Sequence, residues 1–228
     1  MKRKVLVADI GGTRVKLLMS LRDERVFASG PRVRPEQLIA KLKESARGWR
    51  FDMASIGFPA PISKGCIVKD PTFGQRVDWF QFRQSPGRAD TPDQRCGHAS
   101  ARQLPWRAHA LSGLGTGLSS ALVWDKTLMS LELGDLPYPD GYIIENYLGV
   151  PGLALLREKK WKREVTYAVA QLKRSFIADY VVLGGGNVRR FDRFPEDVEP
   201  GQNENAFLGG IRLWETKRHS RELKWRVI

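Results

Sequence analysis

Three glycine-rich stretches of the 228-residue chain have the residue types and spacing that bind phosphate groups. Each begins at or near the end of an apolar run: DIGGTRVK at Asp9, GLGTGLSS at Gly113 and LGGGN at Leu183. Glycines let backbone N–H groups approach phosphate oxygens closely, and the threonines of the first two stretches add hydroxyl donors. One such turn usually serves backbone geometry alone, but three in one chain favour a phosphate-binding site.

Asp9 adds a carboxylate to the first of these stretches. A carboxylate at a strand end can hold Mg²⁺ through water, which suits a hard cation. None of the three stretches has the P-loop pattern, and the first strand is not followed by the dinucleotide fingerprint. The chemistry indicated is therefore phosphate and Mg²⁺ binding outside those two classes.

Segments with strand and helix character alternate along the chain and predict an α/β protein that positions these loops. Apolar runs predict strands at 5–8, 15–19, 53–58, 62–68, 119–124, 128–133 and 179–183. Helical spacing predicts helices over 35–46, over 152–178 in two pieces around Lys159 and Lys160, and over 205–214. The polar and basic segment 217–228 is expected to be poorly ordered.

The composition limits the class and the partners. The formal net charge is +13, which suits a polyanion, but the basic residues are scattered, so specific nucleic-acid binding is not expected. No apolar run is long enough for a membrane span, and the N-terminus does not look like a signal peptide. Two cysteines favour a reducing compartment, and we expect a cytoplasmic protein without a disulfide framework.

As a set, the motifs resemble the actin-like sugar kinases. DIGGTRVK looks like their first phosphate motif, GLGTGLSSALV like the second, and VVLGGGN like the adenosine-side loop. More narrowly, IGFPAPISKG, LELGDLPY, KKWKREV and NAFLGGIRLWE resemble the ROK (repressor, ORF, kinase) family, closest to short glucokinases and polyphosphate glucokinases. The resemblance covers about 5–215, with one gap.

This resemblance implies a two-lobed, actin-like ATPase (ribonuclease H-like) sugar kinase fold. The N-terminal lobe would span 1–112 and the C-terminal lobe 113–216, whose last helix can pack back on the first lobe, followed by the basic tail 217–228. The implied ligands are a sugar, Mg²⁺, and ATP or inorganic polyphosphate as phosphoryl donor. Family members are often homodimers, but no interface is legible in this sequence.

The resemblance also assigns roles to individual residues. The residues expected to bind Mg²⁺ and the donor phosphates are Asp9, Gly11, Gly12, Thr13, Lys16, Gly115, Thr116 and Gly117. The nucleotide is expected to bind at Gly184, Gly185 and Gly186, and the sugar at Gly57, Pro59 and Glu132. Glu132 matches the glutamate of the family's E-x-G-H motif, although Asp135 stands at the histidine position, and we expect it to point into the cleft.

Two further expectations come from what the family pattern lacks here. The cysteine-rich zinc motif of many relatives is missing, so we expect no structural zinc. No DNA-binding domain precedes the first strand, which disfavours the repressor branch.

The gap lies between residues 75 and 112, where relatives carry an Asn-Asp pair. In the family this pair binds the sugar, and its aspartate is the general base that takes a proton from the attacking hydroxyl. This chain has Gln94 and Arg95 there, so no catalytic base is assigned in the given frame.

The genetic code offers an explanation for the gap. Read one base later with permitted codons, PDQRCGHASARQL gives LINDAAMQALGSY, which resembles the missing segment and contains Asn-Asp. The same shift turns GQRVDWFQF into GSGWTGFNF and WRAHALS into GGRMLFL. We interpret Gln75–Ser112 as frame-shifted, by an extra base near Gly74 and a lost base near Ser112.

A sequencing artefact and a pseudogene lesion both remain open, and a real divergent insert is the alternative. In the frame-shift interpretation, Cys96, His98 and His109 do not form a metal site. They also lack a fourth ligand and the usual paired spacing.

The leading hypothesis is therefore a sugar kinase that transfers a phosphoryl group to glucose or a related hexose, inactive as written. A non-catalytic ROK protein that binds sugar or nucleotide is the alternative. A nucleic-acid-binding regulator is a third hypothesis, supported only by the net positive charge.

Overall fold

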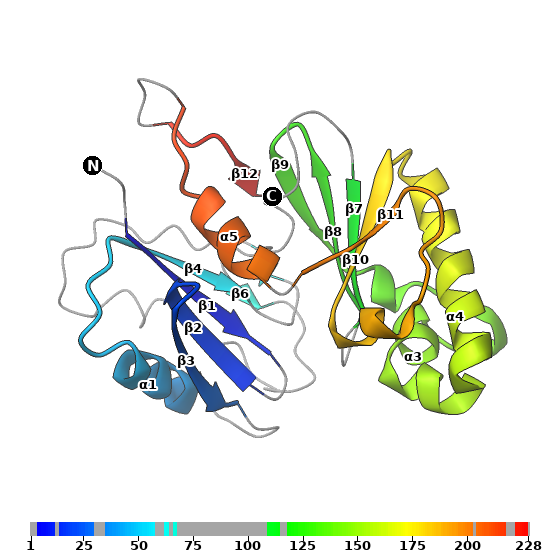
Figure 1. The fold of residues 1–228 in the computed structure, drawn as a ribbon, viewed down its shortest axis with the longest axis horizontal. Helices are drawn as coiled ribbons and strands as arrows, with labels where there is room; N and C mark the ends of the chain where they lie inside the picture. Colours follow the sequence, from blue (N-terminus) through cyan, green and yellow to red (C-terminus); the bar gives the residue numbers. More distant parts are fainter. Residues whose placement is uncertain are drawn as a thin grey trace. The chain divides into compact units, whose positions relative to one another are not determined.

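The computed structural model describes residues 4–11, 14–29, 35–57, 62–63, 66–67, 109–114, 118–202, 204–217 and 222–227 (Figure 1). The chain divides into two compact units, the first made of Met1–Arg102 with Ala206–Val227 and the second of Gln103–Asn205. The lobe limits expected from the sequence, 1–112 and 113–216, stay a prediction. No helix in the described ranges is long and apolar enough to cross a membrane.

The first unit is built on a four-stranded sheet. Its strands are β1 (Val5–Ile10), β2 (Arg14–Ser20), β3 (Asp23–Ala28) and β4 (Met53–Gly57), in the order β3-β2-β1-β4. β1 is antiparallel to β2 and parallel to β4, which confirms the predicted hairpin of the first two strands. The helix α1 (Pro35–Ser45) lies between β3 and β4 in the chain, and the short strands β5 (Ile62–Ser63) and β6 (Cys66–Ile67) pair with each other.

The side chains of β1 supply both cores of this unit, because successive residues of a strand point to opposite faces. Leu6, Ala8 and Ile10 pack in a cluster with Leu38 and Leu42 of α1. On the other face, Val5 and Val7 pack with Phe207 of α5 (Glu204–Arg212) and with Trp214. Thus α1 and α5 cover opposite faces of the sheet.

Ser55 ties β4 to α5 through two buried hydrogen bonds. Its hydroxyl donates to the Gly210 carbonyl at 2.7 Å and accepts from Nε1–H of Trp214 at 2.9 Å. At Gly210 an added Cβ would lie 2.9 Å from both Val7 methyl groups. The close approach of helix and sheet therefore depends on a glycine and a serine.

We predict that Ser55→Ala lowers the free energy of unfolding by about 1–3 kcal/mol, because a buried indole N–H loses this acceptor. Ser20→Ala is the matched control. Ser20 is exposed and accepts one long bond of 3.3 Å from the Arg22 N–H, so a change within about 0.5 kcal/mol is expected. Urea unfolding measures the stability of both variants. Equal losses of unfolding free energy would show that the buried hydrogen bonds of Ser55 do not stabilise the fold.

The second unit holds a sheet in which five strands follow the order β11-β10-β7-β8-β9. They are β7 (His109–Leu114), β8 (Leu118–Trp124), β9 (Thr127–Leu131), β10 (Tyr180–Gly184) and β11 (Val198–Pro200). Between β9 and β10 come the 3-10 turns η2 (Leu133–Asp135) and η3 (Pro139–Gly141), then α3 (Ile144–Leu148) and α4 (Val150–Ser175); η4 (Gly186–Arg190) follows β10.

Trp161 of α4 anchors the core of this unit. Its side chain is fully buried with Val165, Val181 and Leu183, and its indole N–H donates to the Leu148 carbonyl at 2.7 Å. The predicted break in this long helix is real: Arg157 has φ 59° and ψ 157°, so the helix is interrupted there, slightly before Lys159.

The tail expected to be poorly ordered is partly structured. The backbone of Lys217 donates to Glu222 and that of Lys224 to Glu215, and β12 (Arg226–Val227) follows. Trp225 is buried, which gives this otherwise polar segment an apolar anchor. The expectation was wrong for residues 222–227, because a single large aromatic outweighed the polar composition around it.

Candidate functional site

Three residues predicted for the site lie at one level of the first sheet. In the register of the strands, Asp9 of β1 is opposite Lys16 of β2 on one side and Gly57 of β4 on the other. β1 and β4 are parallel, so Asp9 and Gly57 both lie near the carboxyl ends of their strands. A predicted donor-side carboxylate and a predicted sugar-side glycine are thereby neighbours.

The Asp9 carboxyl lies in a partly buried position. Burial raises its pKa, and the charge of Lys16 offsets part of this rise. Lys16 also forms an ion pair with Glu24 of β3, with an N–O distance of 3.6 Å. A single carboxylate at a strand end fits a hydrated Mg²⁺ ion, which keeps most of its water ligands.

We predict that Asp9→Asn makes the protein more stable at pH 7 in metal-free buffer. A folded-state pKa above the unfolded value means that the folded chain holds the proton more tightly. The ionised form therefore destabilises the fold at neutral pH, and this effect fades as pH falls through the raised pKa.

Urea unfolding with EDTA at pH 7 and near pH 4 checks this prediction: the advantage of Asp9→Asn should shrink at the lower pH. Asp23→Asn, which changes an exposed carboxylate on β3, is the control. Lower stability of Asp9→Asn at pH 7 would show that Asp9 makes a stabilising bond.

The turn after β1 is tight at its first residue. The Gly11 N–H donates to the Arg14 carbonyl at 2.8 Å, and the Gly11 carbonyl accepts from the Ser29 hydroxyl at 2.8 Å. An added Cβ at Gly11 would lie 3.0 Å from the Arg14 oxygen, so a larger residue is disfavoured. Gly12 and Thr13 lie outside the described residues.

In the second unit, two of the glycine stretches start side by side. β10 is parallel to β7, and Gly184 is paired with Gly113 at their carboxyl ends. In open α/β sheets, ligands bind outside the carboxyl ends of parallel strands. The stretch after Gly113 and the stretch after Leu183 therefore leave the same edge, although Gly115, Thr116 and Gly117 lie outside the described residues.

Gly185 and Gly186 line a recess of about 270 Å³. Gly185 has φ 89°, a conformation that favours glycine. An added Cβ at Gly201 would lie 3.1 Å from the Gly184 Cα. The recess is also lined by Val188, Arg189, Phe191, Phe194, Pro200 and Gly201. Its glycine walls leave backbone groups accessible, as a nucleotide site requires.

An ion-pair network holds η4, which directly follows these glycines, against α4. Glu158 accepts from Arg190 at 2.9 Å and pairs with Lys162 at 2.9 Å, while Lys162 reaches Asp192 at 3.4 Å. These charges are largely exposed, so each pair contributes little alone, but together they link two elements.

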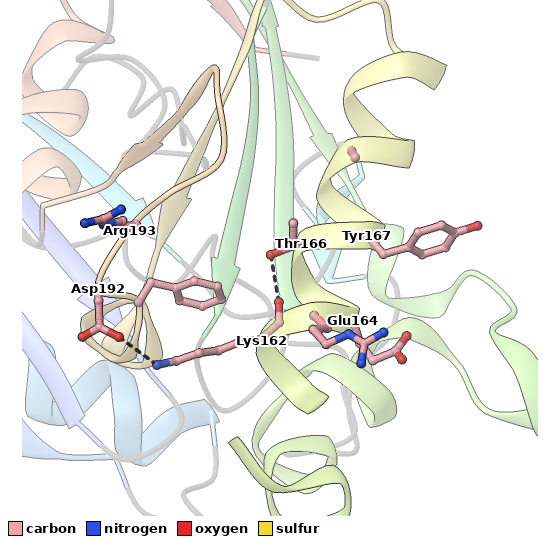
Figure 2. A pocket seen from close by; sticks show the side chains of 9 residues that line it. Lys162, Glu164, Thr166, Tyr167, Asp192 and Arg193 are labelled. Carbon is pink, nitrogen blue, oxygen red and sulfur yellow. Dashed lines mark hydrogen bonds and ion pairs between the residues drawn. The ribbon is translucent and has the colours of Figure 1, made fainter. Parts of the chain in front are cut away.

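A wider groove of about 910 Å³ lies between α4 and the segment after η4. Figure 2 shows Lys162 reaching towards Asp192, and Thr166 bonded to the helix backbone. Among the described residues that line this groove, none was predicted for the site. The groove therefore carries no functional assignment.

Glu132 lies one residue beyond the end of β9, and its side chain is exposed. The sequence placed it inside the predicted strand 128–133; the strand ends earlier, at Leu131, because the chain turns into η2 at this residue. Its expected direction, into a cleft between the lobes, stays a prediction.

The structure therefore brings together Asp9, Lys16 and Gly57 in the first unit, while in the second it does not place Glu132 beside Gly184, Gly185 and Gly186. The described residues leave out Pro59, Cys96 and His98, and of the metal candidates only the backbone of His109 is described, in β7. Sequence reasoning missed Arg189 and Gly201 in the recess. Nothing in the sequence signalled them, because their place depends on where η4 and β11 turn.

The sequence matches no protein-family model and no curated protein. The structure, however, matches solved sugar kinases over nearly their whole length.

The polyphosphate/ATP-glucomannokinase of Arthrobacter sp. strain KM matches with a TM-score of 0.69 and 16% identity, over 91% of this chain and 96% of that chain. A ROK family glucokinase from Streptomyces griseus, solved with glucose and AMPPNP, matches with a TM-score of 0.69 and 14% identity, over 92% and 98%. A ROK family protein from Streptococcus pneumoniae TIGR4, solved with sucrose, matches with a TM-score of 0.64 and 12% identity, over 91% of this chain and 96% of that chain.

The chain therefore has the actin-like ATPase fold seen in ROK family sugar kinases and glucokinases. At these identities, the likeness is one of fold.

Proposed function

We propose that the chain is a ROK-type sugar kinase. It would transfer a phosphoryl group from ATP or inorganic polyphosphate to glucose or a related hexose. The Streptomyces griseus glucokinase was solved with glucose and the ATP analogue AMPPNP, which supports ATP as the donor. The Arthrobacter enzyme is a polyphosphate/ATP-glucomannokinase, which supports either donor. The two cysteines suit a cytoplasmic location.

One observation carries the proposal. Asp9 lies beside Gly57 at the carboxyl ends of β1 and β4, and Gly184 lies beside Gly113, where the stretch GLGTGLSS begins, at the carboxyl ends of β10 and β7. This pairing of motifs that lie far apart in the sequence supports a phosphate, metal and sugar site at these edges. Any turn after a strand lies at a carboxyl end, but unrelated turns need not lie on neighbouring parallel strands as these do.

The residues have distinct tasks in this proposal. Asp9 would hold Mg²⁺ through water, and Lys16 beside it would add positive charge towards the donor phosphates. When bound, Mg²⁺ stabilises the charge that develops on the transferred phosphoryl group. Gly185 and Gly186 would border the nucleotide, and Gly57 with Glu132 the sugar. Catalysis would come from positioning and charge stabilisation.

The base that takes the proton from the sugar hydroxyl is missing from the given frame. Gln94 and Arg95 lie outside the described residues, and a guanidinium stays protonated at any usable pH. We propose that the shifted frame restores an Asn-Asp pair at these positions. DNA sequencing from the codon of Phe73 to that of Thr116 tests this directly.

A non-catalytic binding protein is the second candidate. The literal sequence favours it, because Arg95 cannot act as a base and would place a positive charge beside the attacking hydroxyl.

Glucose 6-phosphate formation, assayed separately with ATP and with polyphosphate, tests the kinase. The restored-frame protein should form product with at least one donor and only in the presence of sugar. Glucose binding without product from either donor would favour the non-catalytic protein.

A further inference from the structure

The Ser120 side chain binds the turn that carries Glu132. β9 ends at Leu131, and Glu132 leaves the strand with φ −111° and ψ 58°. The Ser120 hydroxyl donates to the Leu131 carbonyl at 2.7 Å and accepts from the Leu133 N–H at 3.0 Å. The two bonded backbone groups flank Glu132 on either side.

The rest of the turn is fixed against the same strand. The Glu132 carbonyl accepts from the Asp135 N–H at 3.1 Å. An added Cβ at Gly134 would lie 3.1 Å from the carbonyl oxygen of Leu118, the first residue of β8, and 3.2 Å from Cβ of Glu145. The turn therefore sits closely between β8 and α3, and Ser120 is its side-chain link to β8.

We propose that Ser120 is a positioning residue for the sugar site, which fixes the backbone on both sides of Glu132 and so sets the direction of that carboxylate. The inference rests on the proposed function, which assigns Glu132 to the sugar. A serine hydroxyl can donate one bond and accept another at once, and this geometry uses both. The stretch GLGTGLSS thus serves the phosphate loop and, through its last serine, the sugar carboxylate.

Removing the hydroxyl should move the carboxylate rather than remove it. Ser120→Ala deprives the Leu131 carbonyl and the Leu133 N–H of their shared partner. A carboxylate displaced by a fraction of an ångström binds its ligand less well, and we expect glucose affinity to fall about 10-fold. Ser120→Thr keeps the hydroxyl and should keep the affinity.

Glucose titration by calorimetry on the full-length, restored-frame protein measures these affinities. Thr166→Ala is the matched control, because it deletes one hydroxyl that donates to a backbone carbonyl, that of Lys162 at 2.8 Å, within α4. Glucose affinity should not change in this control. If Ser120→Ala does not fold, Ser120→Cys, with a weaker donor of similar size, should show a smaller loss of the same kind.

A double-mutant cycle separates positioning from general stability. Glu132→Gln should weaken glucose binding, and Ser120→Ala added to it should cost little more, because the carboxylate it positions is gone. Unfolding stability should instead fall in both backgrounds. If the fold losses in glucose affinity of the two single variants multiply in the double variant, Ser120 acts independently of Glu132. That result would assign Ser120 a structural role and overturn the inference.

The binding data distinguish a wrong role for Ser120 from a wrong role for Glu132 and from a wrong proposed function. Unchanged affinity in Ser120→Ala beside a loss in Glu132→Gln would overturn the role of Ser120 alone. Unchanged affinity in both variants would remove Glu132 from the sugar site and the inference with it. A restored-frame parent that binds no glucose would overturn the proposed function itself.

Discussion

A gene with the extra base near Gly74 removed and the lost base near Ser112 replaced should encode an active sugar kinase. The protein made from the given frame should show no sugar phosphorylation. General-base help alone is worth about 100- to 10,000-fold in rate, and the shifted frame also changes every residue around the expected base. Steady-state assays of glucose phosphorylation on both purified proteins, with ATP and with polyphosphate, measure the difference.

The control for this prediction is a restored-frame protein with alanine in place of the aspartate that the shifted frame gives at position 95. It should fold as the restored protein does and lose the activity. Robust kinase activity from the given 228-residue chain would overturn the account, as would genomic DNA whose shifted frame does not encode Asn-Asp.

The second prediction with a large effect concerns how the residues of β7 contribute to the stability of the fold. Its residues 109–112 are paired with Tyr180–Leu183 of β10 on one side and with Ser120–Val123 of β8 on the other. Tyr180–Leu183 are all at most 5% exposed, and Ala121, Leu122 and Val123 are buried too. A strand inside such a sheet favours a continuous apolar run. The given frame has His109 and Ser112 there, whereas the shifted frame reads MLFL.

We therefore predict that combining His109→Met, Ala110→Leu, Leu111→Phe and Ser112→Leu raises the free energy of unfolding by roughly 3 kcal/mol, from the added apolar area. Denaturant unfolding measures this without any need for catalysis. Ser130→Leu is the control, because Ser130 is an exposed residue of β9, and its effect should stay within about 0.5 kcal/mol. A less stable quadruple variant would mean that the given frame is the native one in this strand.

Much of the fold could be predicted where apolar periodicity is strong. The β1–β2 hairpin, α1, the interrupted α4 and α5 all follow from it. The strand β3 was missed, because its sequence DERVFA is polar and none of its residues is fully buried. The helix α3 and the strand β11 were missed because they are only five and three residues long.

The candidate site could be predicted as a set of residues, and its geometry could not. Glycine and acid motifs mark Asp9, Gly57 and Gly184, but the register that sets Asp9 beside Gly57 joins strands far apart in the chain. The turn at Glu132 depends on a serine in another strand, which local pattern does not reveal.

The contribution of α5 to the first unit has a consequence for biosynthesis. Gly210, whose carbonyl binds Ser55, lies 155 residues after it, and the whole second unit is translated in between. At ordinary elongation rates the apolar face formed by Val5 and Val7 therefore waits on the order of ten seconds for Phe207 and Trp214. The first unit can therefore finish folding only after the whole second unit has been made, and until then the Val5 and Val7 face of its sheet lacks Phe207 and Trp214.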